Sequence, residues 1–396
     1  MNLVERRIAT NEVPWRGEGA VGTPIVVHGN PTEGDVHGKR VVLAGTNNYL
    51  GLTFHPECIA AAQRALTEHG TGTTGSRVAN GTYPEHAALE REIAAFYGAR
   101  SAIVFTTGYQ ANVGMIAAIA QHGTSILLDA ESHASIYDGA TLSGATIYRF
   151  KHNDVKDLEK KLRRLDKPED ALVITEGIYS MLGDTAPLVD ICAATKAHGA
   201  ALLVDEAHSF GVLGHTGRGL AEAAGVEDQV DVVVGTFSKS LGCVGGYAVS
   251  RMHDLDALRT AARAYVFSAS PVPSVIASAR AALRVLGREP DLRRRLMDNA
   301  TRVYRALQQF GYELGPEVSP VVGAIIRDRE NDKAKTLAAW RFLLDEGVYV
   351  NLVGPPASPG PYCLLRCSLS AAHTPEQIER IVEAYRALKT RGPLAE

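Results

Sequence analysis

Long apolar runs are missing from this chain of 396 residues. No window approaches the about 18 uninterrupted apolar residues of a membrane-spanning helix, and the N-terminal residues lack the apolar segment of a secretory signal peptide. Neither sign of charge is in excess, because 41 Lys and Arg oppose 44 Asp and Glu, and no basic tract is long enough to follow a nucleic acid backbone. These absences predict a cytoplasmic protein with no stable membrane insertion and no nucleic acid partner.

Cysteine is also scarce. The odd number and the scatter of the five thiols predict reduced cysteines instead of a disulfide framework. Two of them are close in sequence, but two thiols are too few for a metal site, so we expect no bound metal. The five are Cys58, Cys192, Cys243, Cys363 and Cys367.

Hydrophobic residues make up 45% of the chain, which is enough to bury a large core divided into two or three lobes. From about residue 100, short apolar runs alternate with longer helical patterns. Such runs predict a mostly parallel sheet covered by helices on both faces, with ligands at the carboxyl ends of the strands. The expected strands are 102–105, 125–129, 146–150, 171–177, 201–207, 231–238 and 245–250.

Three parts of the chain follow from this pattern. Residues 1–45 form an N-terminal segment, residues 46–285 a large domain, and residues 286–396 a smaller α+β domain. The smaller domain combines amphipathic helices with three expected strands. These strands are 322–328, 348–352 and 363–369.

Asp205 and Lys239 each follow an apolar run at the carboxyl end of an expected strand. A lysine can hold an aldehyde cofactor as a Schiff base, and an aspartate can keep the nitrogen of its pyridine ring protonated. A solvated lysine at a strand end is the simpler interpretation of Lys239 alone. A carboxylate directly after four apolar residues, however, is costly to bury unless a cation faces it, and a pyridinium would be such a cation.

Other candidates are weaker when each is taken alone. His208 is close enough to Asp205 to reach the phenolic oxygen of the same cofactor, although a capping histidine would look similar. The turn 107–112 joins a strand to a helix whose first amides suit a phosphate, as those of an ordinary turn also would. His133 either lies flat on an aromatic ring or is a structural histidine.

Six segments occur in a fixed order over most of the chain: TNNYLGL, SHASIYDG, EGIYSMLGD, LLVDEAHSFG, GTFSKS and LLRCSL. Together they resemble the α-oxoamine synthases, which are fold-type I transferases dependent on pyridoxal 5′-phosphate. The resemblance implies a mostly parallel seven-stranded sheet in the large domain, a smaller C-terminal domain, and a homodimer with shared active sites. Its members join an amino acid to an acyl thioester, in most cases with loss of CO₂.

The resemblance assigns roles around the cofactor ring. Lys239 matches the Schiff-base lysine that later transfers a proton, and Asp205 matches the partner of the pyridinium. His133 matches the imidazole that stacks on the ring. His208 and Ser180 match the groups that bind the phenolic oxygen.

The resemblance also implies a phosphate site built from two loops and a second subunit. The amides of Gly108 and Tyr109 match one loop, and Thr236 and Ser238 match the other. Ser270 would contribute from the second subunit.

Arg366 matches the arginine that binds the substrate carboxylate through its forked guanidinium. Asn47 and Ser76 match positions next to the amino acid substrate. Ser76 stands where the glycine-using aminolevulinate synthases carry threonine, and its smaller side chain leaves room for a serine hydroxymethyl group.

Within the family, SHASIYDG, RFKHND and EGIYSMLGD resemble the bacterial serine palmitoyltransferases most. Those enzymes condense L-serine with a long-chain acyl thioester, carried by coenzyme A or a carrier protein, to 3-ketodihydrosphingosine and CO₂. Two positions depart from them: Gly354 stands where they tend to have an arginine, and Asn47 where they can have a tyrosine. A related synthase that uses alanine or glycine, such as an 8-amino-7-oxononanoate synthase or a secondary-metabolite enzyme, therefore stays open. So do a catalytically silent partner subunit and an aminotransferase.

Overall fold

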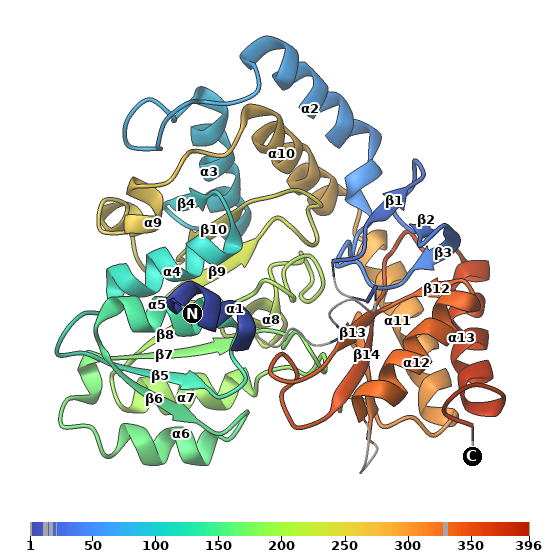
Figure 1. Cartoon of the computed structure of the whole chain (residues 1–396). Helices are drawn as coiled ribbons and strands as arrows, with labels where there is room; N and C mark the ends of the chain where they lie inside the picture. Colours follow the sequence, from blue (N-terminus) through green and yellow to red (C-terminus); the bar gives the residue numbers. More distant parts are fainter. Residues whose placement is uncertain (1, 11–14, 16–18, 21, 328–331, 396) are drawn as a thin grey trace.

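The computed structural model describes residues 2–10, 15, 19–20, 22–327 and 332–395. Asp328, the last residue of the expected strand 322–328, and parts of the N-terminal segment lie outside these ranges. Figure 1 shows a larger part built around one sheet and a smaller part at the right of the view, where the first strands of the chain meet its C-terminal elements. The strands are β1 (Ile25–Val27), β2 (Glu33–Val36), β3 (Lys39–Leu43), β4 (Ala102–Phe105), β5 (Ser125–Asp129), β6 (Thr146–Phe150), β7 (Ala171–Glu176), β8 (Ala201–Asp205), β9 (Val232–Thr236), β10 (Gly246–Val249), β11 (Val321–Ile326), β12 (Val348–Tyr349), β13 (Asn351–Val353) and β14 (Cys363–Ser368).

The helices pack on both parts. None of the helices in the described ranges combines the length and the apolarity that a membrane crossing requires. The helices are α1 (Leu3–Thr10), α2 (Pro56–His69), α3 (Pro84–Tyr97), α4 (Gly108–Ile119), α5 (Ala134–Ser143), α6 (Val155–Leu162), α7 (Leu188–Ala197), α8 (Leu220–Ala223), α9 (Arg263–Val266), α10 (Pro273–Arg288), α11 (Asp291–Gln309), α12 (Asp332–Asp345) and α13 (Pro375–Thr390).

The central sheet has seven strands in the order β4-β10-β9-β8-β7-β5-β6. Strand β10 runs antiparallel to both of its neighbours, and the remaining pairs are parallel. The predicted mostly parallel seven-stranded sheet is therefore confirmed. The runs expected at 102–105, 125–129 and 146–150 coincide with β4, β5 and β6.

Both faces of this sheet are buried, which explains why its strands are apolar almost throughout. Successive strand residues point to opposite faces. Leu128 and Ile174 pack with α4 and α5 on one face, whereas Leu127 and Val173 pack with α6 and α7 on the other. The polar residues that end the strands are thus left at one edge, where a ligand can reach them.

The N-terminal strands join the smaller part. They form a sheet of order β1-β2-β3-β12, in which β12 pairs parallel with β3. The strand expected at 348–352 is wrong as a single element, because it divides at Val350. That residue is buried and its carbonyl accepts a hydrogen bond from the Trp340 indole at 2.9 Å, so β12 pairs with β3 while β13 pairs with β14. Strands β11, β14 and β13 form an antiparallel sheet, and β14 carries Arg366.

Candidate active site

A cavity of about 280 Å³ opens at the carboxyl edge of the central sheet. It brings together most of the residues that the sequence predicted for the cofactor, from segments that are far apart along the chain: Gly108, Tyr109, His133, Asp205, His208, Thr236, Ser238 and Lys239. The lining also contains residues that sequence reasoning missed: Asn112, Ser135, Glu176, Val244 and Gly245.

Asp205 ends β8 and its carboxylate is fixed from two sides. Oδ2 accepts a hydrogen bond of 2.6 Å from the side-chain amide of Asn112, and Oδ1 accepts one of 2.8 Å from the backbone of Ala207. Asn112 also donates to the Ser135 hydroxyl at 3.0 Å. The carboxylate is buried, so these bonds define its direction at the floor of the cavity.

Lys239 follows β9 and shares the cavity with two carboxyl groups. Burial lowers the pKa of Lys239 to about 8, while Asp205 and Glu176 act in the opposite direction and Arg366 adds to the lowering. Burial and the neighbouring Asp205 raise the pKa of Glu176 well above its usual value. The lysine therefore carries a neutral amine at a lower pH than an exposed lysine would.

Glu176 ends β7 and is paired with Asp205 in the register of the sheet. Its Oε1 accepts a hydrogen bond of 2.5 Å from the backbone N–H of His133. The imidazole of His133 lies 2.7 Å from the Ser135 hydroxyl through Nδ1. These contacts hold His133 at the start of α5, on the wall of the cavity.

His208 is buried, and its Nδ1 lies 2.7 Å from the hydroxyl of Tyr49. Burial raises the pKa of Tyr49 to about 12, so the phenol keeps its proton. Burial and the charge of Lys239 lower the pKa of His208 well below its usual value, so the ring is neutral. Donation from Tyr49 to Nδ1 would leave the ring proton on Nε2 and make that nitrogen the hydrogen-bond donor.

The other end of the cavity is lined by the first turn of α4. Thr107 caps this helix by accepting a hydrogen bond from the Gln110 backbone at 3.1 Å, and the next amides belong to Gly108 and Tyr109. A Cβ atom at Gly108 would lie 2.7 Å from the Cβ of Thr236, so only glycine allows the two loops to approach this closely. The open helix N-terminus gives this end a positive potential.

Thr236 and Ser238 differ in what their hydroxyls can do. The Thr236 hydroxyl donates to the carbonyl of Gly245 at 2.8 Å, so its proton is used inside the protein. Ser238 is exposed to the cavity, and its backbone N–H donates to the Thr236 oxygen at 3.2 Å. Thr236 thus shapes the loop, and the cavity-facing hydroxyl of Ser238 lies 2.9 Å from the Thr236 oxygen, to which it donates.

Arg366 lies on β14 of the smaller part and is buried. Its Nε donates to the carbonyl of Ser180 at 2.5 Å, and Nη1 donates to Oδ1 of Asn47 at 3.2 Å and to the Ser368 hydroxyl at 2.9 Å. Two of the predicted substrate and cofactor residues, Asn47 and Ser180, are therefore brought directly to Arg366. The fixed guanidinium is a positive centre for a carboxylate.

A second cavity, of about 560 Å³, is also lined by His133. Ser180 lines it, together with Tyr137, Tyr179 and the loop 356–359. Gly354 lies two residues before this loop, and a Cβ atom there would lie 2.6 Å from the indole ring of Trp15. The indole of the N-terminal segment thus occupies the space that a side chain at position 354 would need.

Ser76 and Ser270 are placed together, apart from the lining of both cavities. Ser76 forms a bridge with Ala269, and Ser270 donates its backbone N–H to Gly75 at 2.9 Å. The Ser270 hydroxyl lies 3.0 Å from Nε2 of His86. Ser270 was predicted to contribute from a second subunit and Ser76 to lie next to the amino acid, and both stay predictions.

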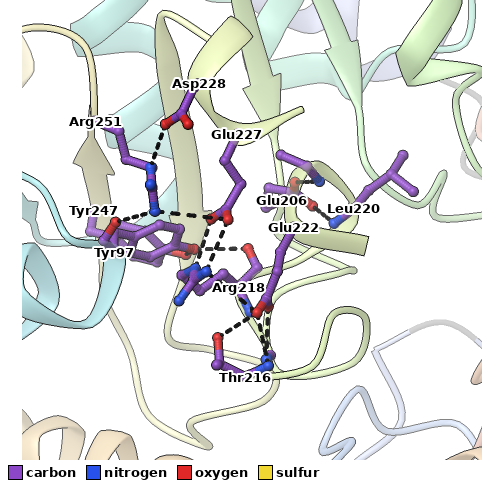
Figure 2. A network of polar contacts seen from close by, with 12 residues as sticks. Tyr97, Glu206, Thr216, Arg218, Leu220, Glu222, Glu227, Asp228, Tyr247 and Arg251 are labelled. Atoms are coloured by element: carbon purple, nitrogen blue, oxygen red, sulfur yellow. Dashed lines mark hydrogen bonds and ion pairs between the residues drawn. The ribbon is translucent and has the colours of Figure 1, made fainter. Parts of the chain in front are cut away.

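Glu206 follows Asp205 but faces away from the cavity, into the network that Figure 2 shows. Its carboxylate accepts hydrogen bonds from the backbone of Leu220 at 2.8 Å and of Ala221 at 2.9 Å, the first residues of α8. In the same network Arg218 forms a two-fold contact with Glu227, at 2.7 and 2.9 Å. Adjacent carboxyl groups thus have separate tasks, because Asp205 serves the cavity and Glu206 fixes the loop beside it.

Comparisons with known proteins show which family and which relatives this chain is similar to. The model of the family "Aminotransferase class I and II" matches residues 39–384. A serine palmitoyltransferase of Caulobacter vibrioides is 54% identical over 357 residues, which cover 90% of this chain and 87% of that protein. The solved structure of a serine palmitoyltransferase from S. paucimobilis with a bound PLP–myriocin aldimine superposes with a TM-score of 0.92 at 45% identity and covers 98% of both chains. An 8-amino-7-oxononanoate synthase of Geobacter sulfurreducens is 41% identical over 350 residues, or 88% of each protein.

Proposed function

Because this chain belongs to the α-oxoamine synthases, a branch of the class I and II aminotransferase family, we propose that it condenses L-serine with a long-chain acyl thioester. The products are 3-ketodihydrosphingosine, CO₂ and the free thiol. The observation that carries the choice of serine is the 54% identity to a serine palmitoyltransferase, compared with 41% to an 8-amino-7-oxononanoate synthase.

The cavity at the edge of the sheet suits pyridoxal 5′-phosphate. Asp205 provides a buried, oriented carboxylate for a pyridine nitrogen, and Lys239 provides an amine for an aldehyde. The amides of Gly108 and Tyr109 and the Ser238 hydroxyl suit the phosphate. Among the described residues, Oδ1 of Asn112 is a buried polar atom without a hydrogen-bond partner, which favours a polar ligand here.

The cofactor supplies electron withdrawal from the α-carbon of the amino acid when it is bound. Arg366 binds the substrate carboxylate and so fixes the direction of the bonds at that carbon. Asn47, which already contacts the guanidinium, restricts the position of the carboxylate. When the cofactor is bound, the imidazole of His133 would cover one face of its ring and keep water from that face.

Lys239 moves the proton. Its Nζ accepts the α-proton of serine, and the pKa of about 8 leaves about a tenth of the amine neutral near pH 7. A new carbon–carbon bond then forms at the acyl carbon while its bond to sulfur breaks, so the thiol leaves. The carboxylate departs as CO₂, and Lys239 returns the proton to the α-carbon.

The site is completed by a second copy of the chain in this proposal. Three large apolar or aromatic side chains are exposed near the cavity or the Ser270 loop: Tyr109 at 47%, Val244 at 54% and Phe267 at 74%. Burial of these residues in a homodimer would favour association and bring Ser76 and Ser270 to the neighbouring site. The five free cysteines favour a reducing compartment, the cytoplasm.

The test is a substrate survey with the purified protein. Palmitoyl-CoA is combined with serine, alanine or glycine, and free thiol and CO₂ are measured. We expect both products with serine only when both substrates are present. Release with alanine or glycine but not serine would replace the serine assignment by another member of the family. A keto acid formed without any thioester would indicate an aminotransferase, and no reaction with loaded cofactor would indicate a silent subunit.

A further inference from the structure

His152 lies outside the cavity, in the turn after β6, and its ring joins two buried carboxylates. Nδ1 lies 2.8 Å from Oδ1 of Asp129, and Nε2 lies 2.7 Å from Oδ2 of Asp184. The side chains of these aspartates are 0% and 5% exposed. A neutral imidazole has only one N–H, whereas the protonated ring donates to both carboxylates.

The surroundings favour the protonated ring. Glu131 adds a third carboxylate at 3.7 Å, and the ring packs edge-on against Tyr179 with centroids 4.5 Å apart. Burial lowers the pKa of His152, but the bonds to Asp129 and Asp184 outweigh it and raise the pKa to about 10. The positive charge of the protonated His152 ring also explains how two buried aspartates can contact the same side chain without strong repulsion between them.

Asp129 holds the turn that carries His133. It ends β5, and its Oδ1 also accepts the backbone N–H of Glu131 at 2.8 Å. Its backbone carbonyl accepts the N–H of Ser132 at 3.1 Å. The turn from Asp129 to His133 is therefore closed by Asp129, which is itself bound to His152.

Asp184 holds the turn that carries Ser180. Its backbone carbonyl accepts the N–H of Tyr179 at 2.8 Å, and the N–H of Gly183 donates back to Tyr179 at 3.1 Å. The carbonyl of Ser180, inside this turn, accepts the Nε of Arg366. The direction of the Arg366 guanidinium thus depends on a turn that Asp184 closes.

We propose that His152 is a positioning residue for the amino acid site, because one charged ring fixes both the turn that carries His133 and the turn that orients Arg366. The inference rests on the proposed function, since it assigns Arg366 to the substrate carboxylate. It distinguishes two effects on ligands: the Asp129 side of the ring governs the cofactor environment, and the Asp184 side governs substrate affinity.

Two substitutions separate these sides. The amide nitrogen of His152→Asn can take the place of Nδ1 and keep the bond to Asp129, whereas that of His152→Gln can take the place of Nε2 and keep the bond to Asp184. For each holoenzyme we would measure the visible absorbance of the bound cofactor, the dissociation constant of the amino acid, and Tm. The amino acid is the one to which the unsubstituted enzyme responds among serine, alanine and glycine, so failure of the serine assignment does not affect this test.

For His152→Asn we expect about tenfold weaker amino acid binding with an unchanged absorbance maximum. For His152→Gln we expect near-normal amino acid binding with a shifted maximum. A lower Tm in both variants with both ligand measurements unchanged would overturn the proposal in favour of a purely stabilising ion pair. Equal changes of both measurements in both variants would also overturn it.

Matched variants guard against general destabilisation. His253 pairs with Asp231 at 2.7 Å near the start of β9, at the opposite edge of the sheet, so His253→Asn should leave both ligand measurements unchanged. If the His152 variants do not fold, Asp184→Asn keeps the shape and weakens only the contacts of Asp184, with the His152 ring and with the Asn153 amide at 3.0 Å. It should reproduce the weaker amino acid binding, and normal binding in Asp184→Asn would contradict the proposal.

Discussion

Asn112 donates its side-chain amide to the carboxylate of Asp205 at 2.6 Å and thereby ties β8 to helix α4. The same helix begins with the amides of Gly108 and Tyr109, one turn before Asn112. Through this bond, one rigid element fixes both the carboxylate for the pyridine nitrogen and the amides for the phosphate. The distance between the two ends of the cofactor site is therefore set by α4, and not by flexible loops.

Substitutions of the neighbouring residues Asp205 and Glu206 should separate an effect on kcat from an effect on stability. Asp205→Asn keeps the size of the side chain but removes its charge, so we expect kcat to fall on the order of 100-fold because the positive ring is no longer stabilised. Tm should fall moderately, since one amide oxygen can accept from only one of the two donors, Asn112 and the Ala207 N–H, so kcat is the measurement that distinguishes this variant. Steady-state kinetics and thermal unfolding of the same preparations test this.

Glu206→Gln is the matched control. Its carboxylate binds the first amides of α8, so this variant should lose stability, by about 1–3 kcal/mol, and keep its kcat. The reverse pattern, with the larger loss of kcat in Glu206→Gln, would contradict the assignment of Asp205 to the cofactor.

The pKa of about 8 for Lys239 predicts the pH dependence of cofactor capture. Only the neutral amine attacks an aldehyde, so the rate of covalent capture of pyridoxal 5′-phosphate by the apoenzyme should rise about tenfold per pH unit below pH 8. Above pH 8 the rate should level off. Stopped-flow absorbance measures it, and a rate that still rises at pH 10 would show an ordinary lysine.

Arg366→Lys tests the forked contact with the substrate. Lysine keeps the charge but can replace neither the planar donors nor the simultaneous contacts to Ser180 and Asn47. We expect the dissociation constant of serine to rise on the order of tenfold while cofactor affinity stays unchanged. Titration followed by absorbance provides both values. Unchanged serine binding would remove Arg366 from the substrate site.

Gly354 and Trp15 form a pair whose coupling can be measured. Gly354→Ala places a methyl group 2.6 Å from the indole, so we expect a loss of about 1–3 kcal/mol in the free energy of unfolding. In a Trp15→Ala background the same change should cost less, because the indole is gone and only the closer packing against Cys363 Sγ, at 3.1 Å, remains. A double-mutant cycle of chemical unfolding checks this. Equal losses in both backgrounds would mean that Trp15 does not occupy this space.

Short, nearly unbroken apolar runs allowed the seven strands of the central sheet to be predicted, because a strand buried on both faces must be apolar almost throughout. The same reasoning located Asp205 and Lys239, since charged residues directly after such strands stand out. It failed at Val350, where one apolar run serves two sheets. The apolar pattern of a short segment does not show with which other strand each of its residues will pair.

Side-chain partners from distant segments were beyond this reasoning. Nothing in the sequence pairs Tyr49 with His208, and Glu176 reads as the polar end of an ordinary strand. Asn112 had one available signal, since it lies four positions after Gly108 and so shares a face with it on α4. His152 belongs to the segment RFKHND, but its two aspartates come from other turns.

The central claim is that Lys239 binds the aldehyde of the cofactor. Reduction of the cofactor-loaded protein with borohydride, followed by proteolysis and mass spectrometry, tests this most directly. We expect a pyridoxyl phosphate mass on the peptide that contains Lys239 and loss of that mass in Lys239→Ala. An adduct on a different lysine, or none after reduction, would contradict it.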